Sequence, residues 1–257
     1  MGNTHDSTPD SGEQDVFHLR DLSNAEFLAQ YAQPGRIGLA SGLTVVDKAI
    51  CLAERHLDAK GQWGQWSHAF VFEGERVDGH SWVIESDLQV EHKHIQLGAQ
   101  ENRVSKYYDE EFYSNLAILD LGLSQEQTNL VLRHGLDLVA THSRYSLREL
   151  LGAYAALRRR ELRSRANALS RENSFFCSAF VVHLFRQAGI DLTPGVNEKA
   201  SAPEDIFRSP VPHRTFLLVR HRVRSAAAKA VRQVHRRIRA GVRHTARRLK
   251  RARPDRD

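Results

Sequence analysis

Two short runs of aromatic and β-branched residues, separated by eight residues, constrain the fold of this chain more than any other feature. They occupy residues 68–72 (HAFVF) and 81–86 (SWVIES), and the segment between them contains two glycines. Two such runs joined by a glycine-containing loop are typical of a β-hairpin. We therefore expect an antiparallel pair of strands near the middle of the chain.

Helical segments surround this hairpin. Residues 45–57 have apolar side chains at helical spacing, and a Ser or Thr followed three residues later by Glu, Asp or Gln predicts N-terminal capping boxes. These boxes lie at Ser23/Glu26, Thr44/Asp47, Ser124/Gln127 and Ser146/Glu149. Further strands are expected at 36–40, 116–121 and 215–219, and a helix that carries Cys177 is expected to end at Gly189. Helices mixed with an antiparallel hairpin favour an α+β fold over a doubly wound parallel sheet.

The distribution of charge divides the chain into three parts. Residues 1–16 are polar and predict a disordered leader, and residues 17–219 form the expected globular domain. Residues 220–257 hold 15 of the 37 Lys and Arg but only 2 of the 31 Asp and Glu, a net charge of +13 that leaves −7 on the rest. Apolar residues three to four apart within this segment predict a basic amphipathic helical tail. Such a tail suits an anionic membrane surface, nucleic acid or the acidic body of the same chain.

The chain has two cysteines, Cys51 and Cys177, which do not make a disulfide framework. No apolar stretch approaches the ~20 residues needed to span a bilayer, and the N-terminal segment lacks the pattern of a secretory signal. We therefore expect a cytoplasmic protein, with the basic tail leaving open a location at the membrane periphery. Cys51 lies within the predicted 45–57 helix and is expected to be structural.

Three residues of the predicted domain could form a nucleophilic site. Cys177 lies three residues after Ser174, in the first turn of a predicted helix, where unpaired amides and the helix dipole favour a thiolate. His68 begins a strand and could serve as the base. Glu85, in the apolar run of the paired strand, could orient the imidazole. Spacing alone permits this arrangement but does not distinguish it from a core cysteine, an ordinary histidine and a solvent-facing glutamate.

The strand SHAFVFEG, the strand WVIES and the helix start FFCSAFVVHLF together resemble the NlpC/P60 superfamily of papain-like enzymes. The order His68, Glu85, Cys177 is similar to that of its circularly permuted YiiX/YebB-like branch, which is distantly related to lecithin:retinol acyltransferases. Residues 201–206 (SAPEDI) also look like a segment found after the cysteine helix of that branch. This chain departs from the pattern in having Gly35-Arg36 where Gly-Asp is usual, and in the long helical insertion between Glu85 and Cys177.

The resemblance implies a cysteine-dependent hydrolase that cleaves a peptide-type amide bond through an acyl-enzyme on Cys177, with no cofactor. His68 would be the base and Glu85 the orienting residue. A lipid-type acyltransferase or thioesterase of the same fold is the enzymatic alternative. A non-catalytic module that binds through the basic tail is the other. The implied substrate is a peptide or an acyl-containing small molecule, and the sequence leaves the acyl acceptor and the oligomeric state open.

Two further histidines, His92 and His94, alternate along a short segment (EHKH). Alternation could place both on one face of a strand, but no third ligand of evident spacing accompanies them, so no metal site is expected. His92 is an alternative to Glu85 as the group that orients His68.

Overall fold

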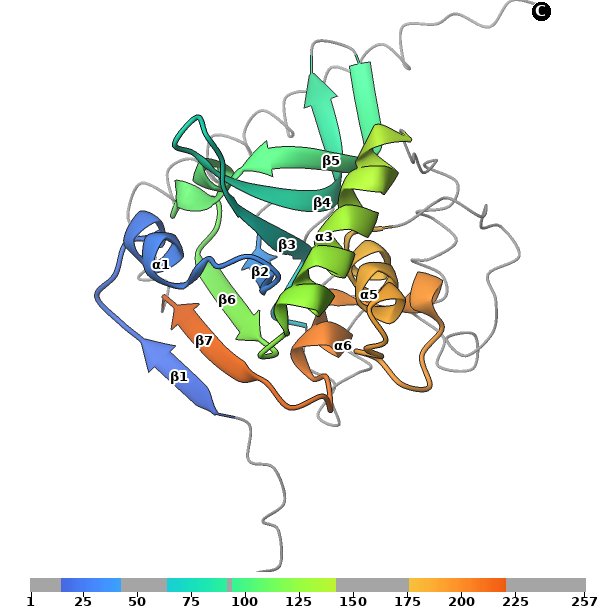
Figure 1. Ribbon diagram of the computed structural model, residues 1–257. Helices are drawn as coiled ribbons and strands as arrows, with labels where there is room; N and C mark the ends of the chain where they lie inside the picture. Colours follow the sequence, from blue (N-terminus) through green and yellow to red (C-terminus); the bar gives the residue numbers. More distant parts are fainter. Residues whose placement is uncertain (1–14, 43–63, 92–93, 142–175, 221–257) are drawn as a thin grey trace, which may run out of the picture. The chain divides into compact units, whose positions relative to one another are not determined.

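A mixed seven-stranded sheet organises the computed structural model, which describes residues 15–42, 64–91, 94–141 and 176–220 (Figure 1). The strand order is β1-β7-β6-β2-β3-β4-β5. All neighbours are antiparallel except β1 and β7, which are parallel. The strands are β1 (Val16–Leu19), β2 (Ile37–Ser41), β3 (His68–Glu75), β4 (Ser81–Glu91), β5 (His94–Arg103), β6 (Asn115–Asp120) and β7 (Arg214–Val219). With its helices, the sheet confirms the predicted α+β class.

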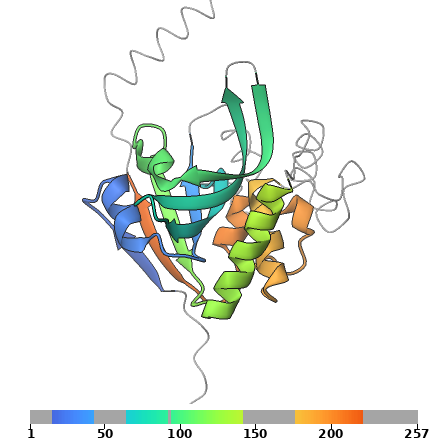
Figure 2. The same ribbon diagram turned by 45° about the horizontal axis from the view of Figure 1, so that its top comes forward.

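Helices cover both faces of the sheet, as Figure 2 shows from the side. The helices and turns are α1 (Asn24–Tyr31), η2 (Val104–Tyr108), α3 (Gln125–Ala140), α5 (Cys177–Gln187), η4 (Glu198–Ala200) and α6 (Pro203–Phe207). The core side chains of α3, α5 and α6 pack against one face, and those of α1 and η2 pack against the other. Among the described residues, no helix combines the length and apolar character that crossing a membrane requires.

Alternation along the strands produces two separate cores. Val71 and Ile84 point toward α3 and α5, whereas their neighbours Phe70 and Val83 point toward α1 and η2. Successive side chains of a strand face opposite sides, so β2, β3, β4, β6 and β7 each contribute to both cores. The α3–α5 core combines aliphatic residues, phenylalanines and Trp66. The face that carries Phe70 also carries His68 and Glu85.

Several local predictions are confirmed. The hairpin at 68–86 is present as β3 and β4, with Val71 paired to Ile84. Capping boxes are present at Ser23 and at Ser124, where each Ser side chain accepts from the backbone three residues on and each third residue's side chain reaches back. Gly189, with φ of 79°, follows α5 as expected of a residue that ends a helix.

Other local predictions need correction. The sequence did not predict β5, which extends the hairpin into a three-stranded meander. It assigned residues 1–16 to a leader, yet β1 begins at Val16, because pairing with β7 supplies backbone partners that the sequence pattern does not reveal. The short helix α6, after α5 in the chain, was not predicted either. The helix predicted at 45–57, Cys51, the capping box at Ser146/Glu149, residues 1–14 of the leader and the basic tail beyond residue 220 lie outside the described residues.

Candidate active site

His68 is the first residue of β3, and 13% of its side chain is exposed. The loop before it is held on two sides. The Ser67 amide donates to the Ala40 carbonyl at 3.0 Å, and the Gln65 amide donates to Glu204 Oε2 on α6 at 3.0 Å. Backbone anchoring on both sides therefore fixes where the imidazole leaves the sheet.

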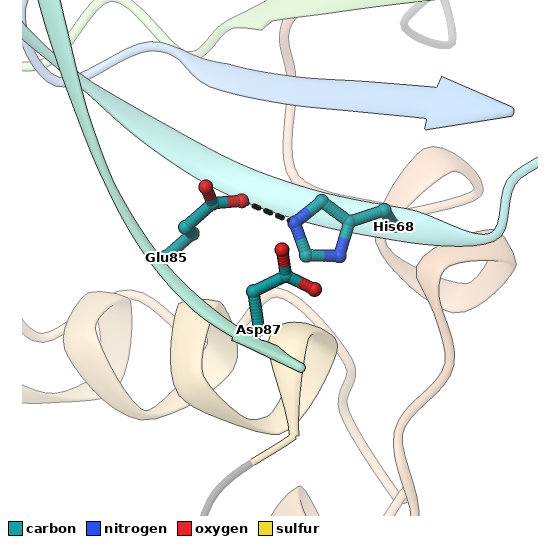
Figure 3. Close-up of side chains that lie close together, drawn as sticks. All are labelled: His68, Glu85 and Asp87. Atoms are coloured by element: carbon teal, nitrogen blue, oxygen red, sulfur yellow. Dashed lines mark hydrogen bonds and ion pairs between the residues drawn. The ribbon is translucent and has the colours of Figure 1, made fainter. Parts of the chain in front are cut away.

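Glu85 lies on β4 opposite Phe70 and is completely buried. Residues 68 and 70 share one face of β3, so the carboxylate reaches the imidazole diagonally across the strand pair. His68 Nε2 donates to Glu85 Oε2, as Figure 3 shows. The sequence suggested that a glutamate in this apolar run would need a partner, and the structure supplies one in the predicted histidine.

Three further donors complete the surroundings of Glu85. Tyr107 Oη donates to Oε2 at 2.5 Å, while Asn102 Nδ2 and Lys106 Nζ each donate to Oε1 at 2.6 Å. Burying a carboxylate without partners is costly, and these four hydrogen bonds, two of them from cationic groups, offset that cost. Glu85 is thereby held in one orientation toward His68.

The turn η2 brings two of these donors to the carboxylate. It follows β5 directly, and the Tyr107 ring stacks on Phe70 with centroids 4.1 Å apart and planes 12° apart. Phe70 in turn lies over Gly38, where an added Cβ would come within 2.2 Å of the phenyl ring. A side chain at position 38 would displace Phe70 and, through it, the tyrosine that contacts Glu85.

The charges of these groups support one another. Burial raises the pKa of Glu85, but the charges of Lys106 and His68 and their hydrogen bonds outweigh burial and hold that pKa far below its usual range. Burial likewise lowers the pKa of His68, yet its interactions with Cys177 and Glu85 raise it well above its ordinary value. The site therefore favours an ionised Glu85 and a protonated imidazole.

Cys177 is the first residue of α5 and is buried, with 8% of its surface exposed. Its side chain lies close enough to His68 to interact with the imidazole and help raise the pKa of that ring. Phe176 precedes the helix and offers no side-chain cap, so the amides of the first turn are available to an anion. Ser178 Oγ donates to the Ser201 carbonyl at 2.8 Å and ties the start of α5 to the segment before α6. Ser174, the residue from which the sequence predicts that Cys177 lies in the first turn of this helix, lies outside the described residues.

All three predicted site residues thus meet at one place. The imidazole of His68 interacts with Cys177 and, through Nε2, with Glu85. His92 lies outside the described residues, and only the backbone of His94 is described, as the first residue of β5. Within the described part of the chain, Glu85 partners His68, and the alternative role of His92 stays a prediction.

Sequence reasoning missed the residues around Glu85. Asn102 and Lys106 flank the end of β5, a strand that the sequence did not predict. The one available signal was the run KYY at 106–108, in which a lysine and an aromatic side chain follow a polar stretch. Without the register of β5, nothing in that run indicates that its side chains turn back onto Glu85.

The site also contains a trio that could hold a metal ion. One side-chain ligand atom from each of His68, Glu85 and Asp87 lies within 4.8 Å of the others. Figure 3 shows the Asp87 carboxylate beside the imidazole ring. However, Lys106 Nζ contacts Glu85 Oε1 and Asp87 Oδ2, each at 2.6 Å, and so places a positive charge between the two carboxylates. This donor set does not fit a metal ion while Lys106 stays in place.

Comparison with known proteins does not assign this chain to a family. No family model matches the sequence, and a search of curated proteins found no significant match. Among solved structures, the chain is similar to the one described as metalloprotein YiiX from Escherichia coli O157:H7, DUF1105. The two are 13% identical with a TM-score of 0.46, and the match covers 72% of this chain and 96% of that one. A likeness this distant carries no statement about activity.

Proposed function

We propose that this protein is a cysteine-dependent hydrolase that cleaves a peptide-type amide bond through an acyl-enzyme on Cys177. One observation carries the proposal. Cys177, at the start of a helix, contacts an imidazole whose other side is held by a fully buried, ionised glutamate. A nucleophile, a base and an oriented third group in hydrogen-bond contact are the recurring arrangement of covalent catalysis by thiols.

In the proposed reaction, His68 holds the proton of the Cys177 thiol, and the thiolate attacks the carbonyl carbon of the substrate. The tetrahedral intermediate places its oxyanion near the amides of the first turn of α5. Protonated His68 then gives its proton to the leaving nitrogen, which departs as an amine and leaves a thioester on Cys177. Water attacks this thioester while His68 takes its proton. The thiolate leaves, the carboxylic acid is released, and the thiolate–imidazolium pair is restored.

The finer assignment of the fold belongs to the same proposal. We infer a circularly permuted papain-like arrangement, because the histidine and glutamate strands precede the cysteine helix in the chain. The start of α5 packs against the sheet beside β3, so the permuted order still allows the nucleophile to meet the base. The contact among Cys177, His68 and Glu85 is the feature that the permuted arrangement would share with an unpermuted papain-like arrangement.

The first test is alkylation of the thiols by iodoacetamide as a function of pH, read by mass spectrometry. Cys51 is an internal reference in every sample. A thiolate–imidazolium pair makes Cys177 react below pH ~8, where a free thiol of pKa ~8.5 is mostly protonated. Replacement His68→Gln should move the reactivity of Cys177 toward that of an ordinary thiol. If Cys177 is inert, or reacts alike in both proteins, the catalytic proposal is wrong.

Amide cleavage needs a test of its own. We expect a mixture of peptides to be cut by the wild-type protein and not by Cys177→Ala, with new amino termini detected by mass spectrometry. A fluorogenic thioester serves as the comparison substrate. Turnover of the thioester without cleavage of any peptide would keep the nucleophile but replace the amide hydrolase by a thioesterase or acyltransferase.

A further inference from the structure

Lys106 lies between two carboxylates at the centre of the site. Its Nζ atom is 2.6 Å from Glu85 Oε1 and 2.6 Å from Asp87 Oδ2. Only 24% of its side chain is exposed, and that of Glu85 is wholly buried. This bridging contact lies on the side of Glu85 away from the oxygen that accepts from His68.

The place that Lys106 occupies is the one a cation would need. A metal ion held by His68, Glu85 and Asp87 would have to approach the same two carboxylates. Glu85 Oε2 already accepts from His68 and Tyr107, and Oε1 accepts from Asn102 and Lys106. Both carboxylate oxygens are therefore in use, and an ammonium group supplies the positive charge that a metal would otherwise bring.

We infer that Lys106 is the resident cation of this site, a positioning residue that excludes divalent metals from the His68–Glu85–Asp87 group and holds Glu85 toward His68. The exclusion of metals stands independently of the reaction. The effect on His68 rests on the proposed function, because it is visible only if Cys177 and His68 form a reactive pair. The two parts therefore need separate measurements.

The charge of Lys106 acts on the thiol in two steps. It is the strongest of the interactions that keep Glu85 ionised, opposing the rise in pKa that burial causes. An ionised Glu85 in turn favours the imidazolium form of His68, which stabilises the thiolate of Cys177. Loss of the ammonium group should therefore raise the pH at which Cys177 becomes reactive, because the effect of Lys106 is transmitted through Glu85 and His68.

The metal measurement is calorimetric titration with Co²⁺ at pH 8 in a Cys177→Ser background, which removes the thiol as a ligand. We expect Lys106→Met to gain one bound Co²⁺ relative to this background and to lose it again when His68→Gln is added. Lys106→Arg and Lys199→Met, a matched lysine on η4, should gain none. Absence of the gain in folded Lys106→Met would overturn the inference. The inference would also be overturned if the Cys177→Ser background protein itself bound Co²⁺ and lost that binding when His68→Gln was added. This second result does not require any Lys106 variant to fold.

The thiol measurement is the pH profile of Cys177 alkylation with the native cysteine present. We expect Lys106→Met to react about 10- to 100-fold more slowly at pH 6, the usual effect of losing a group that orients a functional residue. The loss should shrink as pH rises, and Lys106→Arg should restore most of the rate. An unchanged profile in Lys106→Met would overturn the positioning role. If Cys177 is inert even in the wild type, the proposed function fails, while the Co²⁺ titration still decides the role of Lys106.

Discussion

Among the described residues, two buried carboxylates lie on strands of the sheet, Glu85 on β4 and Asp120 on β6, and they differ in their partners. Asp120, the last residue of β6, accepts from Arg36 at 2.8 Å and from Arg214 at 2.6 Å through Oδ2. Its Oδ1 accepts from the Gly122 amide at 3.0 Å. Glu85 lies within β4, opposite Phe70 of β3. Both carboxylates are buried and both accept several hydrogen bonds. Burial alone therefore does not distinguish a carboxylate in a candidate active site from one that only stabilises the fold.

The partners make the difference. Burial raises the pKa of Asp120, but the Gly122 amide and the two guanidinium groups lower it below its usual value. Those guanidinium groups stay charged at every accessible pH. Glu85 instead contacts His68, which can gain or lose a proton near neutral pH and which also contacts a thiol. A carboxylate held by fixed charges stabilises the fold, whereas one held partly by a titratable group can serve chemistry.

The largest expected effect is common to both carboxylates and concerns stability. We expect Glu85→Ala to lower the free energy of unfolding by about 3–5 kcal/mol, because it leaves the mostly buried His68 and Lys106 without their counter-charge. Asp120→Ala should cost less, because one of its two cationic partners, Arg214, is more than half exposed to solvent. Urea unfolding measures this loss. Glu75→Ala, at an exposed position of β3, is the control and should change stability by less than about 0.5 kcal/mol. A negligible loss at either buried site would show that the pair there is not effectively desolvated.

The second expected effect separates the two carboxylates. Glu85→Gln should slow alkylation of Cys177 at pH 6 by about 10- to 100-fold, since a neutral amide cannot stabilise the imidazolium form of His68. Asp120→Asn should leave the rate within about twofold, because its partners do not contact the thiol. Equal rates in the two variants would mean that the difference in partners has no chemical consequence.

These two carboxylates also show what the sequence could predict. The hairpin pattern was enough to predict that His68 and Glu85 could share a face, because alternation fixes which side chains of a strand lie together. The meeting of Cys177 with that pair was predicted only from the resemblance to a known family. Arg36 stands where the resembled family has an aspartate, and its ion pair with Asp120 was not foreseen. That pair joins residues 84 positions apart, so no local pattern encodes it.

The donors around Glu85 were beyond reach for the same reason. Asn102, Lys106 and Tyr107 meet the carboxylate only because β5 pairs with β4 and η2 folds back over Phe70. In β5 (HIQLGAQENR) apolar residues alternate only over Ile95, Leu97 and Ala99, and the remaining residues are polar or glycine, so the local signal for a strand is weak. Pairing with β4 overrides this weak local preference. The same pairing brings the three donors to Glu85.

A third prediction uses the pH dependence of stability to sharpen the comparison. The pKa of His68 is raised by folding, so its contribution is complete below pH ~6.5 and is lost as pH rises through the folded pKa. The pKa of Asp120 is lowered, so its contribution is complete above pH ~4 and is lost as pH falls. The measurement is the urea unfolding midpoint as a function of pH. His68→Gln should reduce the fall in midpoint that the wild type shows as pH rises, and Asp120→Asn should reduce the fall that it shows as pH decreases. If His68→Gln leaves the fall at high pH unchanged, the raised pKa of His68 is contradicted.

The smallest expected effect concerns a neutral donor at each carboxylate. At Asp120 the neutral donor is a backbone amide, which substitution does not remove. Glu85 has two neutral donors, Asn102 Nδ2 and the hydroxyl of Tyr107, and Tyr107→Phe deletes the hydroxyl while keeping the ring on Phe70. Three donors remain on Glu85, so we expect only a loss of about 1–3 kcal/mol in stability and a slowing of Cys177 alkylation by less than about tenfold. The same alkylation and urea series measures both. Suppose instead that Tyr107→Phe slows alkylation as much as Glu85→Gln. The neutral hydroxyl of Tyr107 would then matter as much as the charge of Glu85. In that case the contrast between titratable and permanently charged partners would not explain the difference between Glu85 and Asp120.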